Sequence, residues 1–466
     1  MKSVMAETRK IRCLFGTDGV RDIANRGLMT PEMALSLGRA FVLFMTERGI
    51  PRPTVALGRD TRRSGYMLEA ALSAGLTSAG ADVLSLGVIP TPGVSYAVRH
   101  EGIHGGAVIS ASHNPAEYNG IKFLDSKGYK LSDDDEAAIE EYLGDPLMDE
   151  WRPSGASIGV VRQSPESVLR YRDWLKGLFG EGWLSGQVAV IDCANGAASA
   201  IAGDLFSGCG IDARMVGNGP DGLNINEGVG VMHMQHLARE ITSSKACFGI
   251  AFDGDADRVL LADSKGRIID GDILLWVLAR WLQKKGTLGS GVVATVMSNM
   301  ALEERLAESG ISLTRCPVGD RYVLESMKKS DSRLGGEQSG HIILYQHVHT
   351  GDGLCTALNF LKACEELGED LDTLVDRFAR FPQVLKNLRV DTKTGFLESK
   401  EIQKAILDCQ RQLGDKGRVF VRMSGTEPLV RILVEAKEES LLSEISNRIL
   451  ETIRAAGAES LSERKG

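Results

Sequence analysis

The sequence predicts an α/β protein with three similar mixed α/β domains and a smaller C-terminal α+β domain. Short β-rich runs alternate with longer helical runs from residue 54 onward, the same order of elements returns twice, and the order changes after Phe381-Pro382. Alternation of strand and helix is typical of parallel strands joined by crossover helices. The 466 residues also suffice for about three or four domains.

The first two rounds of elements are predicted from β-rich and Ala/Leu-rich runs in turn. The first round is strand 54–57, helix 66–79, strand 82–86, helix 94–100 and strand 107–110. A polar stretch at 144–157, with Pro146 and Pro153, predicts a linker. The second round is strand 188–192, helix 197–206, strand 213–216, helix 234–243 and strand 248–252.

The third round and the last domain complete the prediction. The third round is helix 273–283, strand 292–296, helix 301–309 and strand 312–315. The last domain is strand 384–390, helix 400–413, strands 418–422 and 430–435, and helix 441–455. These rounds predict four domains, at residues 1–155, 156–262, 263–381 and 382–466.

Composition and charge exclude several classes of protein. Hydrophobic residues make up 43% and charged residues 25%, proportions of an ordinary globular chain rather than a disordered one. With 54 Lys and Arg against 62 Asp and Glu, the net charge of −8 argues against nucleic acid as the main partner. We expect no membrane span and no signal peptide, because the apolar runs are short and residues 1–10 are charged. A cytoplasmic protein is therefore expected.

A rigid polar loop follows the strand 107–110 and reads Ser-Ala-Ser-His-Asn-Pro at 110–115. Pro115 fixes a turn and disfavours the helical region for Asn114, so Ser112 is held at the end of a strand. Lys122 follows a few residues later. The loop lacks the G-x-S-x-G elbow of serine hydrolases. From spacing alone, a reactive serine and an ordinary polar turn both stay open.

An acidic loop follows the apolar strand 248–252, with Asp253, Asp255 and Asp257 at alternate positions. Three carboxylates so close together repel one another unless a cation lies between them. Oxygen ligands alone favour a hard ion such as Mg²⁺ or Ca²⁺. An EF-hand is excluded because its sixth and twelfth positions are Arg258 and Ser264 here. The alternative to a metal site is a solvated acidic turn.

A third loop reads Gly-Gly-Glu-Gln-Ser-Gly-His at 335–341. In an extended run, Glu337, Ser339 and His341 project together, an arrangement suited to hydrogen bonds with sugar hydroxyls. A plain glycine-rich turn is the alternative interpretation.

A fourth loop, at 422–428, links two predicted strands of the last domain. A guanidinium fork together with hydroxyl and backbone donors is typical of a phosphate cradle, with a β-turn around a structural arginine as the alternative. The donors are Arg422, Ser424, Thr426 and the N–H groups around Gly425, with Arg431 further along.

Together these loops resemble the α-D-phosphohexomutase family, and within it the members that act on glucosamine phosphate. The resemblance covers nearly the whole chain, and Asp22 and Met423 are small departures where the family often has Gly and Pro. Besides the four loops, the motifs are Phe15-Gly16-Thr17-Asp18-Gly19-Val20-Arg21, Asp192-Cys193-Ala194-Asn195-Gly196-Ala197, Pro220-Asp221-Gly222-Leu223-Asn224-Ile225-Asn226, Val318-Gly319-Asp320-Arg321-Tyr322 and Thr350-Gly351-Asp352-Gly353.

The resemblance implies a heart-shaped enzyme whose four domains surround one cleft. Ser112 carries a phosphoryl group, and one Mg²⁺ per subunit is bound by that serine and the three aspartates. Glucosamine 6-phosphate and glucosamine 1-phosphate interconvert through a bound 1,6-bisphosphate, and glucosamine or glucose 1,6-bisphosphate acts as activator. The product leads to UDP-N-acetylglucosamine. The implied partner is the phosphosugar alone, without nucleic acid or membrane, and the chain is a monomer or a homodimer.

The resemblance also implies roles for individual residues. Arg21 and Lys122 are candidates for acid–base work on the sugar hydroxyl, and neighbouring cations are expected to lower the pKa of Lys122. The resemblance also implies that His341 is a catalytic residue. The implied substrate-binding residues are Arg258, Arg321, Glu337, Ser339, Arg422, Ser424, Gly425, Thr426 and Arg431.

Three alternatives stay open. Within the same family, a phosphoglucomutase or a phosphomannomutase is the main alternative. A Mg²⁺-dependent phosphatase uses similar aspartates but does not need a second phosphate cradle. A catalytically silent sugar-phosphate sensor has little reason to keep both Ser112 and the aspartates.

Overall fold

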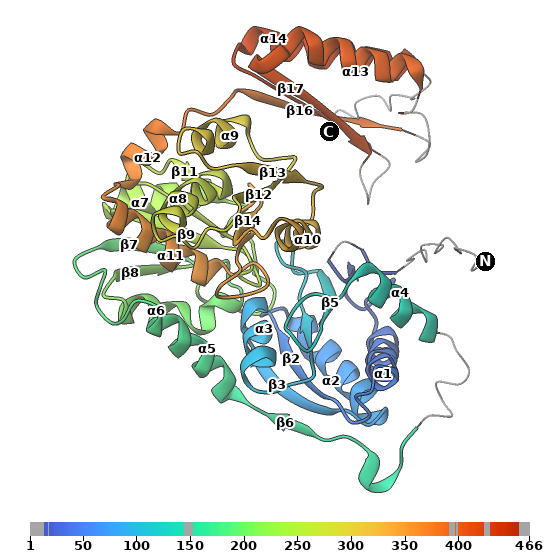
Figure 1. Cartoon of the computed structure of the whole chain (residues 1–466). Coiled ribbons are helices and arrows are strands. Elements are labelled where there is room, and N and C mark those ends of the chain that lie inside the picture. Colours follow the sequence, from blue (N-terminus) through green and yellow to red (C-terminus); the bar gives the residue numbers. More distant parts are fainter. Residues whose placement is uncertain are drawn as a thin grey trace. The chain divides into compact units, whose positions relative to one another are not determined.

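The computed structural model in Figure 1 describes residues 14–16, 18–143, 152–390, 397, 399–423 and 429–455. The chain divides into two compact units. The larger unit runs to Ser298 and includes Leu306–Arg377, and the smaller unit contains Asn299–Arg305 and the chain from Phe378 onward. The four domain boundaries given above stay a prediction.

The first sheet of the larger unit has six strands in the order β1-β5-β4-β2-β3-β6. Strand β2 pairs in parallel with β3 and β4, whereas β5 pairs antiparallel with β4 and β1, so the sheet is mixed. The strands are β1 (Val20–Ile23), β2 (Thr54–Arg59), β3 (Asp82–Val88), β4 (Gly105–Ile109), β5 (Tyr118–Leu124) and β6 (Val161–Gln163).

Both faces of this sheet are covered by helices. Alternate residues of β2 point to opposite faces: Val55 and Leu57 join a core with α1, α2 and α4, while Ala56 joins a core with α3 and part of α5. Thr30 caps α1 by accepting a hydrogen bond from the backbone N–H of Met33. The helices are α1 (Pro31–Glu47), α2 (Arg63–Ser78), α3 (Thr91–His100), α4 (Asp133–Tyr142) and α5 (Pro165–Gly177).

The second sheet has the order β11-β10-β9-β7-β8 and is also covered on both faces. Ala251 of β9 joins a core with α7, and the neighbouring Phe252 stacks on Phe206 of α6. The elements are β7 (Val188–Asp192), α6 (Ala202–Gly208), β8 (Asp212–Val216), α7 (Met234–Ser244), β9 (Phe248–Phe252), β10 (Val259–Ala262) and β11 (Ile268–Ile269). The single helix expected at 197–206 is wrong, because Ile201 leaves the helical region (φ −136°) and separates a short 3-10 turn from α6.

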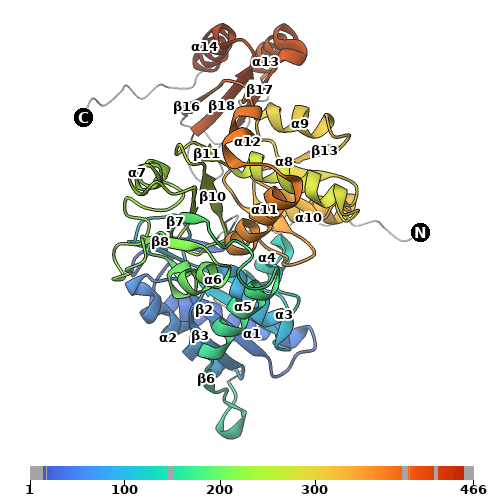
Figure 2. The same ribbon diagram turned by 90° about the vertical axis from the view of Figure 1, so that its left-hand side faces the viewer.

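The third sheet has the order β13-β12-β14-β15, with α10 packed on it through Val323 and Met327. Helices α8 and α11 pack against each other (Figure 2). The elements are α8 (Gly271–Lys284), β12 (Val292–Thr295), β13 (Leu313–Cys316), α10 (Asp320–Ser330), β14 (Leu334–Gly336), β15 (Ile342–Leu344), α11 (Gly353–Leu367) and α12 (Leu371–Arg377).

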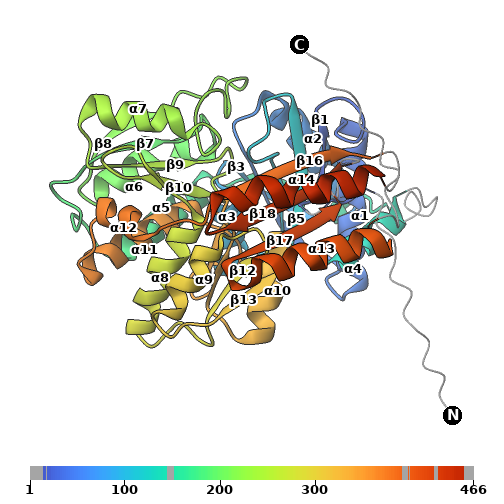
Figure 3. The ribbon, with the colours of Figure 1, turned by 90° about the horizontal axis from the view of Figure 1, so that it is seen from above.

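The smaller unit contains an antiparallel sheet in the order β16-β18-β17. Helices α13 and α14 lie side by side on one face of it (Figures 1 and 3), and their apolar residues form a core of their own with the strands. The elements are β16 (Gln383–Arg389), α13 (Lys400–Leu413), β17 (Gly417–Met423), β18 (Leu429–Ala436) and α14 (Glu439–Ala455). Helix α9 (Met300–Ala307) lies at the boundary between the two units. The predicted α/β class with a C-terminal α+β domain is confirmed.

We predict that Gly75 of α2 cannot be replaced, although alanine is the better helix former. Alanine in a helix interior is favoured over glycine by about 1 kcal/mol, but a Cβ at Gly75 would lie 2.1 Å from the carbonyl oxygen of Leu35 in α1. Gly75→Ala should therefore destabilise the larger unit by about 1–3 kcal/mol, the usual cost of overpacking. The measurement is the midpoint of thermal unfolding.

Gly177→Ala in α5 is the matched control, since no atom lies within 4 Å of its added Cβ. That variant should match or slightly exceed the wild-type midpoint. Equal midpoints for the two variants would show that α1 and α2 do not pack as closely as described.

Candidate functional site

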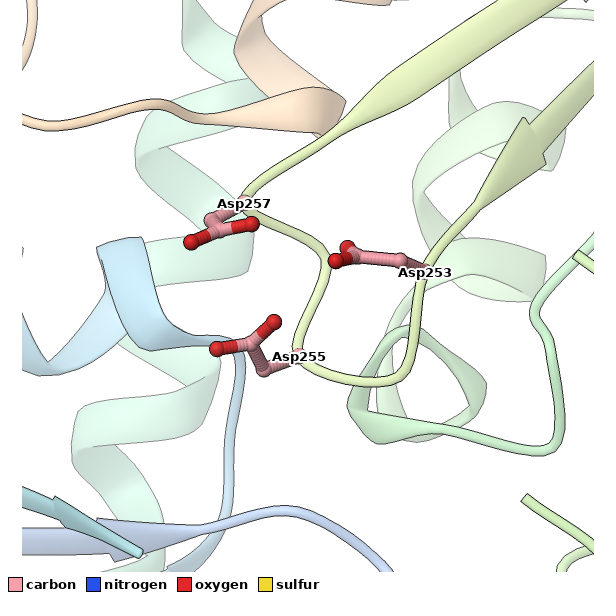
Figure 4. Close-up of side chains that lie close together, drawn as sticks. All are labelled: Asp253, Asp255 and Asp257. Atoms are coloured by element: carbon pink, nitrogen blue, oxygen red, sulfur yellow. The ribbon is translucent and has the colours of Figure 1, made fainter. Parts of the chain in front are cut away.

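The loop that follows β9 brings three buried carboxylates together. Asp253, Asp255 and Asp257 are at most 2% exposed, and one ligand oxygen from each lies within 4.8 Å of the others. Figure 4 shows the three side chains close together, with the carboxylate of Asp253 directed toward those of Asp255 and Asp257. Among the described residues, no other cluster of His, Cys, Asp and Glu has this geometry.

Neighbouring segments hold the backbone of this loop in place. The backbone N–H and hydroxyl groups of Thr91 donate to the carbonyl and carboxylate of Asp255, at 3.0 and 2.6 Å. The backbone N–H of Gly353 donates to the carbonyl of Ala256 at 2.9 Å. A Cβ at Gly254 would lie 2.5 Å from the carbonyl oxygen of Ser112, so only glycine fits there. The carboxylates are therefore positioned by packing rather than by a bound ion alone.

The electrostatics of the three aspartates fit a hard cation. Burial and the neighbouring carboxylates of Asp257 and Asp255 raise the pKa of Asp253 well above its usual value. Burial also opposes ionisation of Asp257, but Lys122, His341 and Arg258 lower its pKa to about 2. One carboxylate oxygen each of Asp255 and Asp257 is buried without a hydrogen-bond partner among the described residues. Buried acceptors without donors, all of them oxygen, are the ligands that a divalent hard ion prefers.

Ser112 lies directly against the acidic loop. Its hydroxyl donates to a carboxylate oxygen of Asp253 at 2.6 Å, and its side chain is fully buried. Its backbone has φ +51°, a left-handed conformation that is uncommon outside glycine and the Asn/Asp group. The predicted strand-end serine and the predicted acidic loop are therefore brought into direct contact.

Lys122 of β5 lies among acids rather than among cations. Its Nζ lies 2.9 Å from an Asp255 oxygen, 3.2 Å from Asp18 and 3.7 Å from Asp257. Burial opposes its charge, but the carboxylates of Asp18 and Asp255 outweigh that effect and raise the pKa of Lys122. The expectation of a lowered pKa is wrong, because distant loops supply more acids than cations at this position.

A second group of charges extends from Lys122 to α10. Asp18 pairs with Arg21 of β1 and accepts a hydrogen bond from Lys130 at 2.5 Å. Lys130 also pairs with Asp320, at the start of α10. Sequence reasoning did not assign Asp18, Lys130 or Asp320 to the site. Asp18 and Asp320 lie inside motifs that carried the resemblance, whereas nothing in the sequence near Lys130 marks it.

These groups line a cavity of about 200 Å³ in the larger unit. Five of the predicted residues are among its lining residues, namely Arg21, Asp257, Arg258, Glu337 and His341. The Nη1 of Arg258 donates to the Nδ1 of His113 at 2.8 Å, and burial together with the charge of Arg258 lowers the pKa of His113 to about 4. The lining residues are Asp18, Arg21, His113, Lys130, Asp257, Arg258, Val318, Gly319, Asp320, Glu337 and His341.

Two predicted substrate-binding residues of the larger unit do not line this cavity. Arg321 is held by the carboxylates of Asp133 and Glu136 on α4. Ser339 is exposed, and its hydroxyl donates to Glu337 at 3.1 Å. Glu337 also accepts from the backbone N–H of Gly319 at 3.1 Å. Roles for Arg321 and Ser339 in substrate binding stay predictions.

The predicted phosphate cradle belongs to the smaller unit. Arg422 of β17 and Arg431 of β18 stand directly opposite each other in the sheet. Burial and the charge of Arg431 lower the pKa of Arg422. Like charges opposite each other weaken a sheet, so an anion bound beside them would be favourable. Ser424, Gly425 and Thr426 lie outside the described residues.

No described helix combines the length and the apolar composition needed to cross a bilayer.

Models of one protein family match most of the chain. The "Phosphoglucomutase/phosphomannomutase, alpha/beta/alpha domain I" model matches residues 12–146, the domain III model matches 270–381, and the C-terminal domain model matches 385–452. Together they cover more than half of the 466 residues.

Full-length relatives and solved structures agree with these matches. The phosphoglucosamine mutase of Carboxydothermus hydrogenoformans is 46% identical over 94% of this chain and 99% of the relative, and that of Bacillus subtilis is 44% identical over 95% and 98%. A phosphoglucomutase/phosphomannomutase family protein from Burkholderia thailandensis has the same fold, with a TM-score of 0.81, 24% identity and coverage of 96% and 98%. Aspergillus fumigatus N-acetylphosphoglucosamine mutase, solved with GlcNAc-6P and magnesium, has a TM-score of 0.68, 19% identity and 97% coverage of both chains.

The resemblance read from the motifs is thus confirmed, and this chain belongs to the phosphoglucomutase/phosphomannomutase family, the α-D-phosphohexomutases.

Proposed function

We propose that this chain interconverts glucosamine 6-phosphate and glucosamine 1-phosphate by phosphoryl transfer through Ser112. The observation that carries the proposal is the placement of the Ser112 hydroxyl, 2.6 Å from Asp253 at the edge of the three-carboxylate cluster. A cation held by these carboxylates would offset the negative charge of a phosphoryl group on that hydroxyl. Full-length relatives named phosphoglucosamine mutase support glucosamine phosphate as the substrate.

The phosphoryl group moves between Ser112 and the sugar in two steps. In the first, the 1-hydroxyl oxygen of glucosamine 6-phosphate bonds to phosphorus as the bond to the Ser112 oxygen breaks, which leaves the 1,6-bisphosphate. The Ser112 oxygen takes a proton from Lys122, and the proton released by the sugar hydroxyl restores that lysine. In the second, the bisphosphate has turned over, and its 6-phosphate returns to Ser112. Glucosamine 1-phosphate is then released with the enzyme phosphorylated again, and an added glucosamine or glucose 1,6-bisphosphate restores the phosphoserine whenever it is lost.

Residues around Ser112 have distinct roles in these steps. Asp253, Asp255, Asp257 and the phosphorylated Ser112 would hold one Mg²⁺, which, when bound, offsets the negative charge of the moving group. The raised pKa of Lys122 keeps it protonated, so it serves as the acid that returns a proton to the Ser112 oxygen when the phosphoryl group leaves. Arg21 and Arg258 add positive charge on the walls of the cavity.

Recognition of the sugar and of its second phosphate falls to other residues. Glu337, with Ser339 and His341, accepts and donates hydrogen bonds at hydroxyls that both orientations of the sugar present. The opposed pair Arg422 and Arg431 binds the phosphate that is not reacting, together with Ser424, Gly425 and Thr426. The chain acts in the cytoplasm on this small substrate, as a monomer or a homodimer and without nucleic acid or membrane.

A second candidate is a phosphoglucomutase or phosphomannomutase. The matching family models carry that description, and every residue assigned to chemistry would serve glucose or mannose phosphates equally well. What separates the candidates is recognition of the 2-amino group.

The test of the proposed function is a comparison of kcat/KM for glucosamine, glucose and mannose 6-phosphates with the purified chain. We expect the highest value for glucosamine 6-phosphate. A preference for glucose or mannose phosphate would favour the second candidate, and no turnover of any of the three would rule out both.

Ser112→Ala should abolish nearly all turnover, because no other hydroxyl contacts Asp253 among the described residues. Intact mass should show one added phosphoryl group on the active wild-type chain and none on the variant. Ser207→Ala, an exposed position on α6, is the control and should keep both activity and the added mass. Substantial turnover by Ser112→Ala would disprove the assignment of the carrier.

Chelation should stop turnover, and Mg²⁺ should raise the melting temperature of the wild-type chain. Binding to the folded state alone stabilises by about 2.7 kcal/mol at 100 times the dissociation constant. Asp255→Asn removes one negative charge from the site and should lose most of the Mg²⁺-dependent shift, whereas Asp212→Asn, at an exposed position of β8, should keep it. An unchanged shift in Asp255→Asn would contradict the metal site.

A further inference from the structure

Arg62 is a fully buried arginine that no step above uses. It is 0% exposed and directs its guanidinium at the loop that carries Ser112. Its Nη2 donates to the carbonyl oxygens of Ser112 and Asn114, at 2.9 and 2.8 Å, and its Nη1 donates to the carbonyl of Pro115. We propose that Arg62 is a positioning residue for phosphoryl transfer, a role that rests on the proposed function of Ser112.

The conformation of Ser112 explains why such a residue is needed. A non-glycine residue with φ +51° is strained and stays in that conformation only where its surroundings hold it. Glycine would remove the strain but also the hydroxyl. The chain therefore keeps the serine and fixes the loop from outside. Three carbonyls bound by one planar guanidinium define the path of the backbone on both sides of Asn114.

The acid that neutralises Arg62 extends the same network. Asp60 accepts from the Nε of Arg62 at 2.9 Å and from the hydroxyl of Ser110 at 2.7 Å. The hydroxyl of Ser110 in turn accepts from the backbone N–H of Ser112 at 2.9 Å. The carbonyl of Ser112 thus accepts a hydrogen bond from Arg62. The backbone N–H of Ser112 is connected to Asp60 through the hydroxyl of Ser110. Both polar groups of the strained peptide segment lead back to one buried ion pair.

Asn226 contacts the same carbonyls from another part of the chain. Its side-chain nitrogen donates to the carbonyl oxygens of Ser112 and Asn114, at 2.9 and 3.0 Å. Its backbone N–H donates to the carbonyl of Ala194 at 2.8 Å. The loop after β4 is therefore fastened both to the residues after β2 and to the segment before α7. We define Arg62, Asp60 and Asn226 as the loop clamp.

The clamp fixes the position of the reacting Ser112 oxygen and does not take part in binding of the sugar. None of its three members lines the 200 Å³ cavity, so their loss should leave the sugar contacts in place. A shift of about 1 Å at the reacting oxygen can reduce the rate a hundredfold. Loss of the clamp should thus lower kcat far more than it changes KM.

Arg62→Met tests this, with Arg59→Met as the matched control. Arg59 is also buried and lies three residues earlier, but it pairs with Glu69 and covers the ring of Tyr66 instead of contacting the loop. It touches the clamp at the backbone carbonyl of Asp60, which accepts a hydrogen bond from its Nη1 at 3.4 Å. We expect kcat for glucosamine 6-phosphate to fall about a hundredfold in Arg62→Met with KM near the wild-type value. Arg59→Met should keep kcat, even where its melting temperature falls as far.

Hydrogen exchange at the loop gives a reading that does not depend on turnover. The backbone N–H groups of Ser112 and Asn114 are hydrogen-bonded within the loop, so their exchange reports how often the loop opens. Exchange of the peptide over 110–118 should be at least about tenfold faster in Arg62→Met than in Arg59→Met. Equal exchange in the two variants would overturn the clamp, whatever the turnover of the wild-type chain.

Two milder variants keep the proposal testable if Arg62→Met does not fold. Arg62→Lys keeps the charge beside Asp60 but lacks the fork for three carbonyls, so it should not restore kcat. Asn226→Ala removes two of the contacts and should lower kcat by a smaller factor with unchanged KM. Wild-type kcat in both variants would overturn the proposal. Absence of turnover in the wild-type chain would instead disprove the proposed function and leave the exchange measurement to decide on the clamp.

Discussion

Three carboxylates lie together in one small buried space at the end of β9. Neighbouring parts of the larger unit offset the unfavourable free energy of burying these charges. Removal of one carboxylate from water is unfavourable, and repulsion from two further carboxylates, with ligand oxygens within 4.8 Å, increases the free-energy cost. Lys122 from β5 offsets part of this charge at Asp255, and Arg258 contributes at Asp257. Burial and the carboxylates of Asp257 and Asp255 raise the pKa of Asp253, so a further positive charge beside it would be favourable.

The same constraint accounts for the alternation of charge across the cavity. Asp18 lies between Lys122 and Lys130, and Lys130 lies between Asp18 and Asp320. Each buried charge therefore has a neighbour of opposite sign, and β1, β5 and α10 are tied together by these pairs. Such an arrangement leaves the cavity walls polar and fixed before any substrate arrives, which lowers the cost of binding a charged sugar phosphate.

The sequence was most informative where neighbours in the chain remain neighbours in space. The boundaries of β7, β9 and α13 match the predicted ranges, because apolar runs or caps mark both ends. The three aspartates could be predicted as a cluster because they lie within five residues of one another. Lys130, Arg62 and Asn226 act through contacts 50 or more residues away in the chain. No local pattern in the sequence indicates such contacts. The predicted lowering of the pKa of Lys122 is wrong for the same reason, because the acids that raise it come from distant parts of the chain.

Backbone strain is concentrated where the chemistry is proposed. Eight described non-glycine residues have positive φ, and two of them, Lys245 and Asp331, simply end helices. Five others lie in the loops around Ser112 and the aspartates: Ser112, Ala194, Asn195, Asn226 and Ala256. A left-handed residue costs of order 1–3 kcal/mol, so such a concentration persists only where the fold provides compensating contacts. Around Ser112 the buried Asp60–Arg62 pair and Asn226 provide them. The stability of the larger unit is thus coupled to the geometry of a few loops, and these contacts hold Ser112 in its left-handed conformation.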